Sequence, residues 1–269
     1  MADTIGFIGG GNMAEALVRG LLAAGHEAPA MMISEPVAQR RSFMRKRYGV
    51  PVTEDNAEVV AASNVVVLAV KPQILPQVLE ALAPAAERTK LFVSIAAGFP
   101  LGRLQKALGK ETRIVRVMPN TPCLVGKGAS VLCAGPSAKA SDVAKVRRLF
   151  AAVGEAHVVE DEKAMHAVTA LSGSGPAYVY RFAEAMMMAG QKAGLSASLA
   201  RSLTLATIAG AAEMMVQTRQ DPADLRKAVS SPGGTTLAGL AVLEEADLPG
   251  TVAAAVRAAA KRSVELARS

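Results

Sequence analysis

A glycine-rich turn lies near the start of the chain, between a short apolar run and an amphipathic stretch. Residues 4–8 predict a buried strand, and residues 12–24 predict a helix. Between them, Gly9, Gly11 and Ala14 fit the spacing G-x-G-x-x-A. In that spacing the first glycine allows a tight turn, the second lets the backbone approach a pyrophosphate, and the small third residue lets helix and strand pack closely. The free N–H groups and the dipole at the helix start favour an anion. We therefore interpret the motif as a dinucleotide-binding turn rather than a simple glycine turn.

The first half of the chain alternates short β-branched runs with amphipathic stretches. Strands are predicted at residues 30–34, 65–70, 91–96 and 113–118, with later ones at 129–133 and 156–159, and a second helix at 37–48. Such alternation indicates a parallel sheet with helices on both faces. Residues 1–161 are therefore expected to form an α/β, Rossmann-like domain.

The second half changes character, because the strand signals stop near residue 161. Helices are predicted at residues 176–193, 198–218, 222–229, 236–245 and 251–267. Pro176 and Pro222 stand where a first-turn proline is tolerated, Asp221 can cap its helix, and Gly194 suits a left-handed helix end. We expect residues 162–269 to form an all-α domain.

The helices of this second half are apolar on nearly every side. One helix is nearly encircled by apolar side chains, namely Phe182, Ala183, Ala185, Met186, Met187, Met188 and Ala189. Several of its faces must therefore be buried. About 108 residues that carry few charges cannot easily cover five such helices. We infer a homodimer formed by the helical domain; the alternative is a compact monomeric bundle.

Composition narrows the classes of partner. The 30 Lys and Arg residues exceed the 23 Asp and Glu residues, which gives a net charge of +7 and suits an anionic partner. Few aromatic residues and no recognised binding motif argue against nucleic acid. No uncharged apolar run approaches 18 residues, so we expect no membrane partner. Two cysteines, Cys123 and Cys133, and three histidines predict neither a metal site nor a disulfide framework, and favour the cytoplasm.

The choice between NADH and NADPH depends on the end of the second strand. Glu35 stands where an acidic residue binds ribose hydroxyls and favours NAD. Ser34 precedes it, and Arg40 and Arg41 begin a run with five basic residues in eight. Arg40 could reach a 2′-phosphate, whereas the alternative for the run is a solvated helix face. We favour NADPH, with NADH as the alternative.

Several segments in fixed order make the chain resemble the pyrroline-5-carboxylate reductases, the last enzymes of proline biosynthesis. The matching segments are residues 5–14, 69–73, 94–98, 118–122, 171–178 and 229–236, and the last two are the most specific. The resemblance implies NAD(P)H as donor, a cyclic imine acid as acceptor and L-proline as product. It also implies a dimer built from the helical half, in many relatives assembled further into a decamer.

The resemblance assigns the cofactor to the glycine turn and to the ends of the following strands. The implied contacts are Ile8, Gly9, Gly10, Gly11, Asn12, Met13, Ser34, Asn56, Ala69, Val70, Lys71, Pro72, Ala96 and Ala97. From the sequence alone, a surface asparagine in a loop is nearly as good an interpretation of Asn56 as a cofactor contact. Residues 118–122 hold two prolines around Asn-Thr, and this rigid turn after a strand is expected to lie under the nicotinamide.

The polar loop at residues 230–236 opens a helix, so its N–H groups and hydroxyls suit a carboxylate. The resemblance assigns Ser231, Gly234, Thr235 and Thr236 to the substrate carboxylate and ring, beside Val229, and makes Thr236 the catalytic contact to the ring nitrogen. Glu162 matches an acidic position near the active site and could contact the substrate amine. Without the resemblance, an ordinary capping loop and an exposed glutamate are equally good interpretations. The loop at 172–176 either faces the nicotinamide across the dimer or is a tight linking turn.

Two other functions stay open. One is a related NAD(P)-dependent reductase of a different imine or of a β-hydroxy acid. Hydride addition to a protonated imine needs no proton transfer in the same step, whereas a hydroxy-acid enzyme would need a proton shuttle, for which only Lys163 lies near a glycine loop. A non-catalytic dinucleotide sensor would keep the Gly9 turn but would not need the loop at 230–236.

Overall fold

The computed structural model describes residues 3–87 and 89–268. Contacts divide the chain into two compact units. The sheet unit comprises Met1–Ser174 and Ala258–Ser269, and the helical unit comprises Gly175–Arg257. This division falls later in the chain than the expected boundary between residues 161 and 162, which stays a prediction.

The sheet unit is built on one mixed sheet of eight strands within the described residues. Its spatial order is β3-β2-β1-β4-β5-β6-β7-β8. The strands are β1 (Ile5–Ile8), β2 (Met31–Ser34), β3 (Val52–Thr53), β4 (Val65–Leu68), β5 (Leu91–Ser94), β6 (Arg113–Met118), β7 (Gly128–Ala134) and β8 (Gly154–Val159). Strand β1 pairs in parallel with β2 and β4, with Ile5 opposite both Met31 and Val65. The predicted strands are therefore confirmed, with shifts of a few residues at their ends.

One ladder departs from the expected parallel sheet. Strand β7 runs antiparallel to β6, with Val115 opposite Ala134. The two strands are joined through the short 3-10 turn η3 (Thr121–Val125). A parallel crossover needs a dozen or more residues, so this short connection can only return the chain in the opposite direction.

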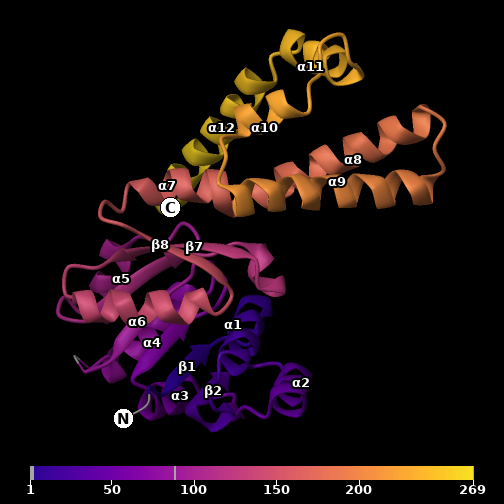
Figure 1. The fold of residues 1–269 in the computed structure, drawn as a ribbon. Coiled ribbons are helices and arrows are strands. Elements are labelled where there is room, and N and C mark those ends of the chain that lie inside the picture. Colours follow the sequence, from indigo (N-terminus) through magenta and orange to yellow (C-terminus); the bar gives the residue numbers. More distant parts are fainter. Residues whose placement is uncertain (1–2, 88, 269) are drawn as a thin grey trace. The chain divides into compact units, whose positions relative to one another are not determined.

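Helices cover both faces of the sheet (Figure 1). On one face, α1 (Asn12–Ala23), α2 (Ala38–Tyr48) and α6 (Ala140–Ala151) contribute buried side chains to a single cluster. On the other, α3 (Asn56–Ala62), α4 (Leu75–Leu82), α5 (Leu101–Leu108) and α7 (Ala164–Val168) contribute to a second cluster. This two-faced burial explains why the strands are continuously apolar instead of alternating.

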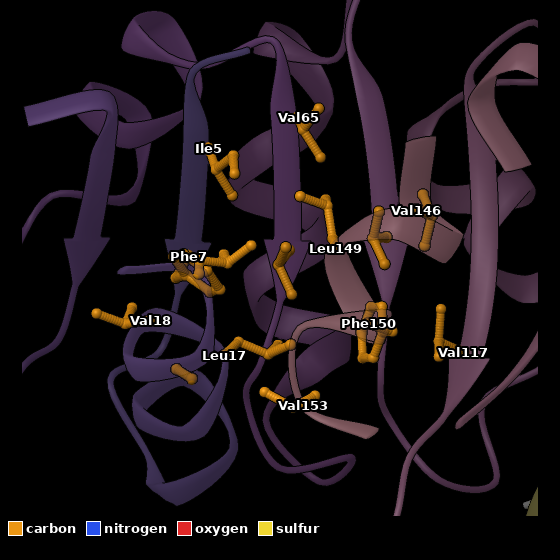
Figure 2. Packing of buried hydrophobic residues seen from close by; sticks show 14 of the residues in the cluster. Ile5, Phe7, Leu17, Val18, Val65, Val117, Val146, Leu149, Phe150 and Val153 are labelled. Atoms are coloured by element: carbon orange, nitrogen blue, oxygen red, sulfur yellow. The ribbon is translucent and has the colours of Figure 1, made fainter. Parts of the chain in front are cut away.

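The first cluster shows how the glycine turn gains a rigid base. Phe7 of β1 and Phe150 of α6 are both fully buried, and Leu17 of α1 packs with them (Figure 2). Each such side chain stabilises the fold by about 1.5–3 kcal/mol relative to leaving it exposed. The strand before the turn and the helix after it are thus both fixed by core packing.

The helical unit contains α8 (Gly175–Lys192), α9 (Ala197–Thr218), α10 (Pro222–Ala228), α11 (Thr235–Glu245) and the first part of α12 (Leu248–Arg268). Helices α8 and α9 run alongside each other as a hairpin (Figure 1). The predicted signals are confirmed: Gly194 has φ +97°, Asp221 accepts the Ala223 N–H at 2.8 Å, and Pro222 opens α10.

Large apolar side chains remain exposed on these helices. Tyr180, Phe182, Met214, Val216 and Val242 are each about half exposed or more in the single chain. Helix α9 has 22 residues and is long and apolar enough, by length and composition, to cross a membrane. Apolar surface on this scale is typical of a face that another protein or a membrane covers.

Candidate functional site

The glycine turn has the geometry that its sequence predicts. Gly9 has φ +98°, and its N–H donates to the Ser34 carbonyl at 2.8 Å. A Cβ at Gly9 would lie 2.9 Å from the Ala69 carbonyl oxygen, so a side chain there would collide with backbone. At Gly11, which precedes α1 without a side-chain cap, a Cβ would meet no atom within 4 Å. The helix start therefore presents free N–H groups beside open space, as an anion site requires.

Charged side chains support the turn from behind. The Glu35 carboxylate accepts the N–H groups of Gly10 at 2.9 Å and Val37 at 3.0 Å. Arg40 donates through Nε to the Gly10 carbonyl at 2.6 Å and through Nη2 to Glu15 at 2.5 Å. Both polar groups of the Gly10 backbone are thus held by Glu35 and Arg40. These are the side chains that the sequence offers for binding the ribose hydroxyls of NAD or the 2′-phosphate of NADP.

Glu15 anchors this network from α1. Its carboxylate also accepts a hydrogen bond from the Tyr48 hydroxyl at 2.7 Å. Burial raises the pKa of Glu15, but the hydrogen bonds from Tyr48 and Arg40, and the Arg40 charge, outweigh burial and leave the pKa below its ordinary value. Glu15 is therefore ionised near neutral pH and keeps Arg40 in place.

Two of the predicted cofactor residues meet at the ends of β2 and α3. The Ser34 hydroxyl donates to Asn56 Oδ1 at 2.6 Å. Asn56 is the first residue of α3, whose N-cap Asp55 accepts the Ala57 N–H at 2.8 Å. The capped helix start places the Asn56 amide at the same sheet edge as the glycine turn.

The other predicted cofactor residues follow the carboxyl ends of neighbouring strands. Ala69 follows β4, and its N–H donates to Ile8 at 2.8 Å; Ala96 and Ala97 follow β5. Pro72 and Ala97 line a hollow of about 470 Å³. Since β1, β2, β4 and β5 are parallel, all these residues share one edge, where α/β sheets bind their ligands. Ile8, Asn12, Met13, Val70 and Lys71 belong to the same turn or edge.

Glu162 has partners inside the sheet unit. Its Oε1 accepts from Arg116 Nη1 at 2.7 Å and from the Leu101 N–H at 2.7 Å. The Arg116 side chain is only 2% exposed, whereas that of Glu162 is 29% exposed, so the pair is buried on the arginine side. These contacts show a structural role for Glu162, and its contact with a substrate amine stays a prediction. Arg116 was not predicted from the sequence, although an arginine among the apolar residues 114–118 is a usable signal.

The polar loop of the helical unit precedes α11. Its turn is closed by the Gly234 N–H, which donates to the Ser231 carbonyl at 3.0 Å, and Gly233 has φ +70°. Gly234 is the N-cap and provides no side-chain cap, so the first N–H groups of α11, including those of Thr235 and Thr236, lack that partner. Val229 ends α10 beside the loop and is 68% exposed. An uncapped helix start flanked by hydroxyls is suited to a carboxylate.

Within the part of the chain that the structure describes, no group of three or more His, Cys, Asp or Glu side chains is arranged to hold a metal ion. Cys123 and Cys133 are free and buried, and burial raises the pKa of both thiols.

Together these features define a Rossmann-type, dinucleotide-dependent oxidoreductase with a second, helical unit. Residues 4–98 match the family model described as NADP oxidoreductase, coenzyme F420-dependent, and residues 162–266 match the model of pyrroline-5-carboxylate reductase dimerisation. The chain belongs to the pyrroline-5-carboxylate reductase family. Its dimerisation domain identifies it as a homo-oligomer, which accounts for the exposed apolar helices.

Relatives and solved structures agree over the full length. The chain is 45% identical to a pyrroline-5-carboxylate reductase of Pseudomonas aeruginosa, covering 98% of this chain and 96% of the relative, and 44% identical to one of Synechocystis, covering 100% of both. Its structure resembles a pyrroline-5-carboxylate reductase of Coxiella burnetii, with a TM-score of 0.96, 37% identity and complete coverage of both chains. It also resembles a Plasmodium falciparum pyrroline carboxylate reductase with NADP bound, with a TM-score of 0.87, 36% identity and 98% coverage of each.

Proposed function

We propose that the protein reduces 1-pyrroline-5-carboxylate to L-proline with NADPH, the final step of proline biosynthesis. The observation that carries the proposal is the uncapped start of α11, with Thr236 in its first turn and Ser231 and Gly234 before it. A helix start of this kind holds a carboxylate through backbone N–H groups, and a threonine hydroxyl beside it can contact a ring nitrogen.

The residues of the sheet unit hold the cofactor in this proposal. The open space at Gly11 and the free N–H groups of α1 fit a pyrophosphate, and the Ser34–Asn56 pair fits the adenosine ribose. When bound, the nicotinamide supplies the hydride. The remaining contacts are assigned to Ile8, Gly9, Gly10, Asn12, Met13, Ala69, Val70, Lys71, Pro72, Ala96 and Ala97.

The loop residues orient the substrate. Ser231, Gly234 and Thr235 hold the carboxylate, Val229 supplies an apolar wall, and the Thr236 hydroxyl hydrogen-bonds the imine nitrogen. The hydride adds to the protonated imine carbon, the C=N π electrons move to nitrogen, and a neutral secondary amine results. No side chain has to transfer a proton in that step, so catalysis depends on alignment.

We infer a preference for NADPH over NADH from the basic side chains at the end of β2. Arg40 donates to the Gly10 carbonyl at 2.6 Å, and Arg41 donates at 2.7 Å to the carbonyl of Glu35, the residue that follows Ser34. Guanidinium groups bind phosphate oxygens with charge-assisted hydrogen bonds. Glu35 is hydrogen-bonded to Gly10 and Val37. Arg40 and Arg41 also have partners in the protein, but they carry the positive charge that attracts a 2′-phosphate.

The finer assembly and the cellular location also belong to the proposal. We infer a homodimer formed by the helical unit and a decamer built from such dimers. The exposed apolar side chains of α8, α9 and α11 support an extensive interface. Two free thiols and a biosynthetic role support the cytoplasm.

A comparison of two acceptors, with and without a carboxylate, tests the proposed reaction and the proposed carboxylate site. We expect rapid NADPH oxidation with 1-pyrroline-5-carboxylate and a kcat/KM about a hundredfold lower with 1-pyrroline, which lacks the carboxylate. Equal kcat/KM for the two acceptors would contradict the carboxylate assignment. No turnover with either, while NADPH still binds, would identify a different imine or carbonyl substrate.

A further inference from the structure

The side chain of Asn120 joins segments that lie far apart in the sequence. Asn120 follows β6 and is the N-cap of η3, a position where asparagine normally caps the helix. It makes no cap hydrogen bond. Instead, Oδ1 accepts the Ala129 N–H at 2.9 Å, and Nδ2 donates to the Ser172 carbonyl at 3.2 Å, with Ser172 Oγ at 3.4 Å. Both the oxygen and the nitrogen of the Asn120 amide are therefore hydrogen-bonded to residues outside η3.

The segment that Asn120 holds is a π-helical turn. Residues Thr169–Gly173 form η4, and the Ser174 N–H donates to the Thr169 carbonyl at 2.8 Å, five residues back. Turns of this type are uncommon and occur frequently at functional sites. A Cβ at Gly173 would lie 2.5 Å from Met118 Cε, so the π turn packs directly on the end of β6. The helical unit begins at Gly175, two residues after the end of this turn.

We propose that Asn120 is a positioning residue for the nicotinamide. Its amide fixes the π turn against residues 118–122, the rigid turn that the sequence predicts to lie under the nicotinamide ring. The kinetic consequence rests on the proposed function. Small displacements of a reacting ring cost large factors in rate, because the chemistry depends on alignment. The contacts of the pyrophosphate and the adenosine, at Gly9 and Ser34, do not involve Asn120 or the π turn. Most of the affinity for the cofactor should therefore remain when the Asn120 amide is changed.

The variant Asn120→Asp isolates the donor side of the amide. Aspartate keeps an oxygen for the Ala129 N–H but has no N–H for the Ser172 carbonyl. We expect kcat to fall by about tenfold to a hundredfold, while the Kd of NADPH changes by less than about twofold. Hydrogen–deuterium exchange of a peptide covering residues 169–176 should become about tenfold faster. This exchange measurement needs no substrate.

Two control variants separate the connection from charge and from general damage. Ser141→Ala removes a hydroxyl from an exposed position on α6, so its kcat and its exchange should stay within about twofold of wild type. Asn64→Asp adds the same charge at an exposed asparagine before β4 and should change neither quantity.

The outcomes are distinct. Wild-type exchange of residues 169–176 in Asn120→Asp would overturn the proposal, whether or not kcat fell. Faster exchange with an unchanged kcat, or a parallel loss of NADPH affinity and thermal stability, would overturn the positioning role. If the wild-type enzyme does not turn over the imine, the proposed function fails, and the kinetic role of Asn120 fails with it; the exchange experiment still decides whether the amide holds the π turn.

Discussion

Arg116 and Glu162 form an ion pair of 2.7 Å that joins the middle of the sheet to the segment before α7. Arg116 is 2% exposed, and the same Glu162 oxygen accepts the Leu101 N–H at the start of α5. One carboxylate therefore ties together β6, α5 and the chain that leads toward the helical unit. A buried pair of this kind contributes little net stability when intact, but removal of one partner leaves an uncompensated charge.

We expect Glu162→Ala to lower the free energy of unfolding by about 3 kcal/mol, because Arg116 would then be buried without its partner. Chemical denaturation measures this loss. The double variant Arg116→Met/Glu162→Gln, which removes both charges, should lose less. Glu155→Gln, which disrupts an exposed pair with His157, should cost under about 1 kcal/mol. Unchanged stability in Glu162→Ala, with a raised KM for the imine, would instead support the substrate contact.

Gly9 and Gly11 should respond differently to alanine. Gly9→Ala introduces a side chain at φ +98° and 2.9 Å from the Ala69 carbonyl, so we expect it to destabilise the fold by about 1–3 kcal/mol. Gly11→Ala meets no protein atom within 4 Å and should leave the melting temperature unchanged. Its methyl group would point into the space assigned to the pyrophosphate, so the Kd of NADPH should rise at least about tenfold. Normal NADPH binding by Gly11→Ala would place the cofactor elsewhere.

Arg40→Gln tests the cofactor preference. Loss of one charge-assisted hydrogen bond to the 2′-phosphate should lower kcat/KM for NADPH by about tenfold. The value for NADH should change much less, because that cofactor carries no 2′-phosphate. Arg45→Gln, an exposed change on the same helix, is the matched control. Equal losses with the two cofactors would show that Arg40 supports the glycine turn and does not select the phosphate.

His166 should make stability depend on pH. Burial, and then the Arg116 charge, lower the pKa of His166 below its ordinary 6.5, although Glu162 opposes this shift. The unfolded chain therefore binds the proton more readily, and the free energy of unfolding should fall as the pH drops through and below 6.5. His166→Asn should flatten this dependence, whereas His157→Asn, at an exposed site on β8, should not. A curve for His166→Asn as steep as that of wild type would assign the dependence to other groups.

Thr236→Ala removes the hydroxyl assigned to the imine nitrogen. We expect kcat/KM to fall by one to two decades, which corresponds to about 1.4–2.7 kcal/mol. Thr251→Ala, an exposed threonine of the same unit, should match wild type. Steady-state kinetics that are unchanged in Thr236→Ala would remove its catalytic role.

The sequence predicted most strands because burial on both faces leaves long apolar runs, as in β4 (Val65–Leu68). It did not identify the helices α3, α4, α5 and α6 or the short strand β3. In α3, seven residues are too few for a clear helical period, although Asp55 is a usable N-cap signal. The direction of β7 also escaped prediction, because the strand pattern does not encode whether its connection is long enough to cross over.

Local motifs located the candidate site better than they revealed its contacts. The positive φ of Gly9 followed from the spacing of the glycines and the flanking elements. The Arg116–Glu162 pair and the Asn120–Ser172 contact could not be read from the sequence, because each joins residues more than forty positions apart. Such pairs depend on how the sheet brings distant segments together, which no local pattern records.

The proposed reduction of 1-pyrroline-5-carboxylate to L-proline can be measured by following the imine to its product. Purified protein would be incubated with NADPH and 1-pyrroline-5-carboxylate, and both NADPH consumed and L-proline formed would be quantified. We expect one L-proline for each NADPH consumed, and loss of nearly all turnover in the double variant Thr236→Ala/Gly11→Ala. NADPH consumption without L-proline, or no consumption by a protein that binds NADPH, would contradict it.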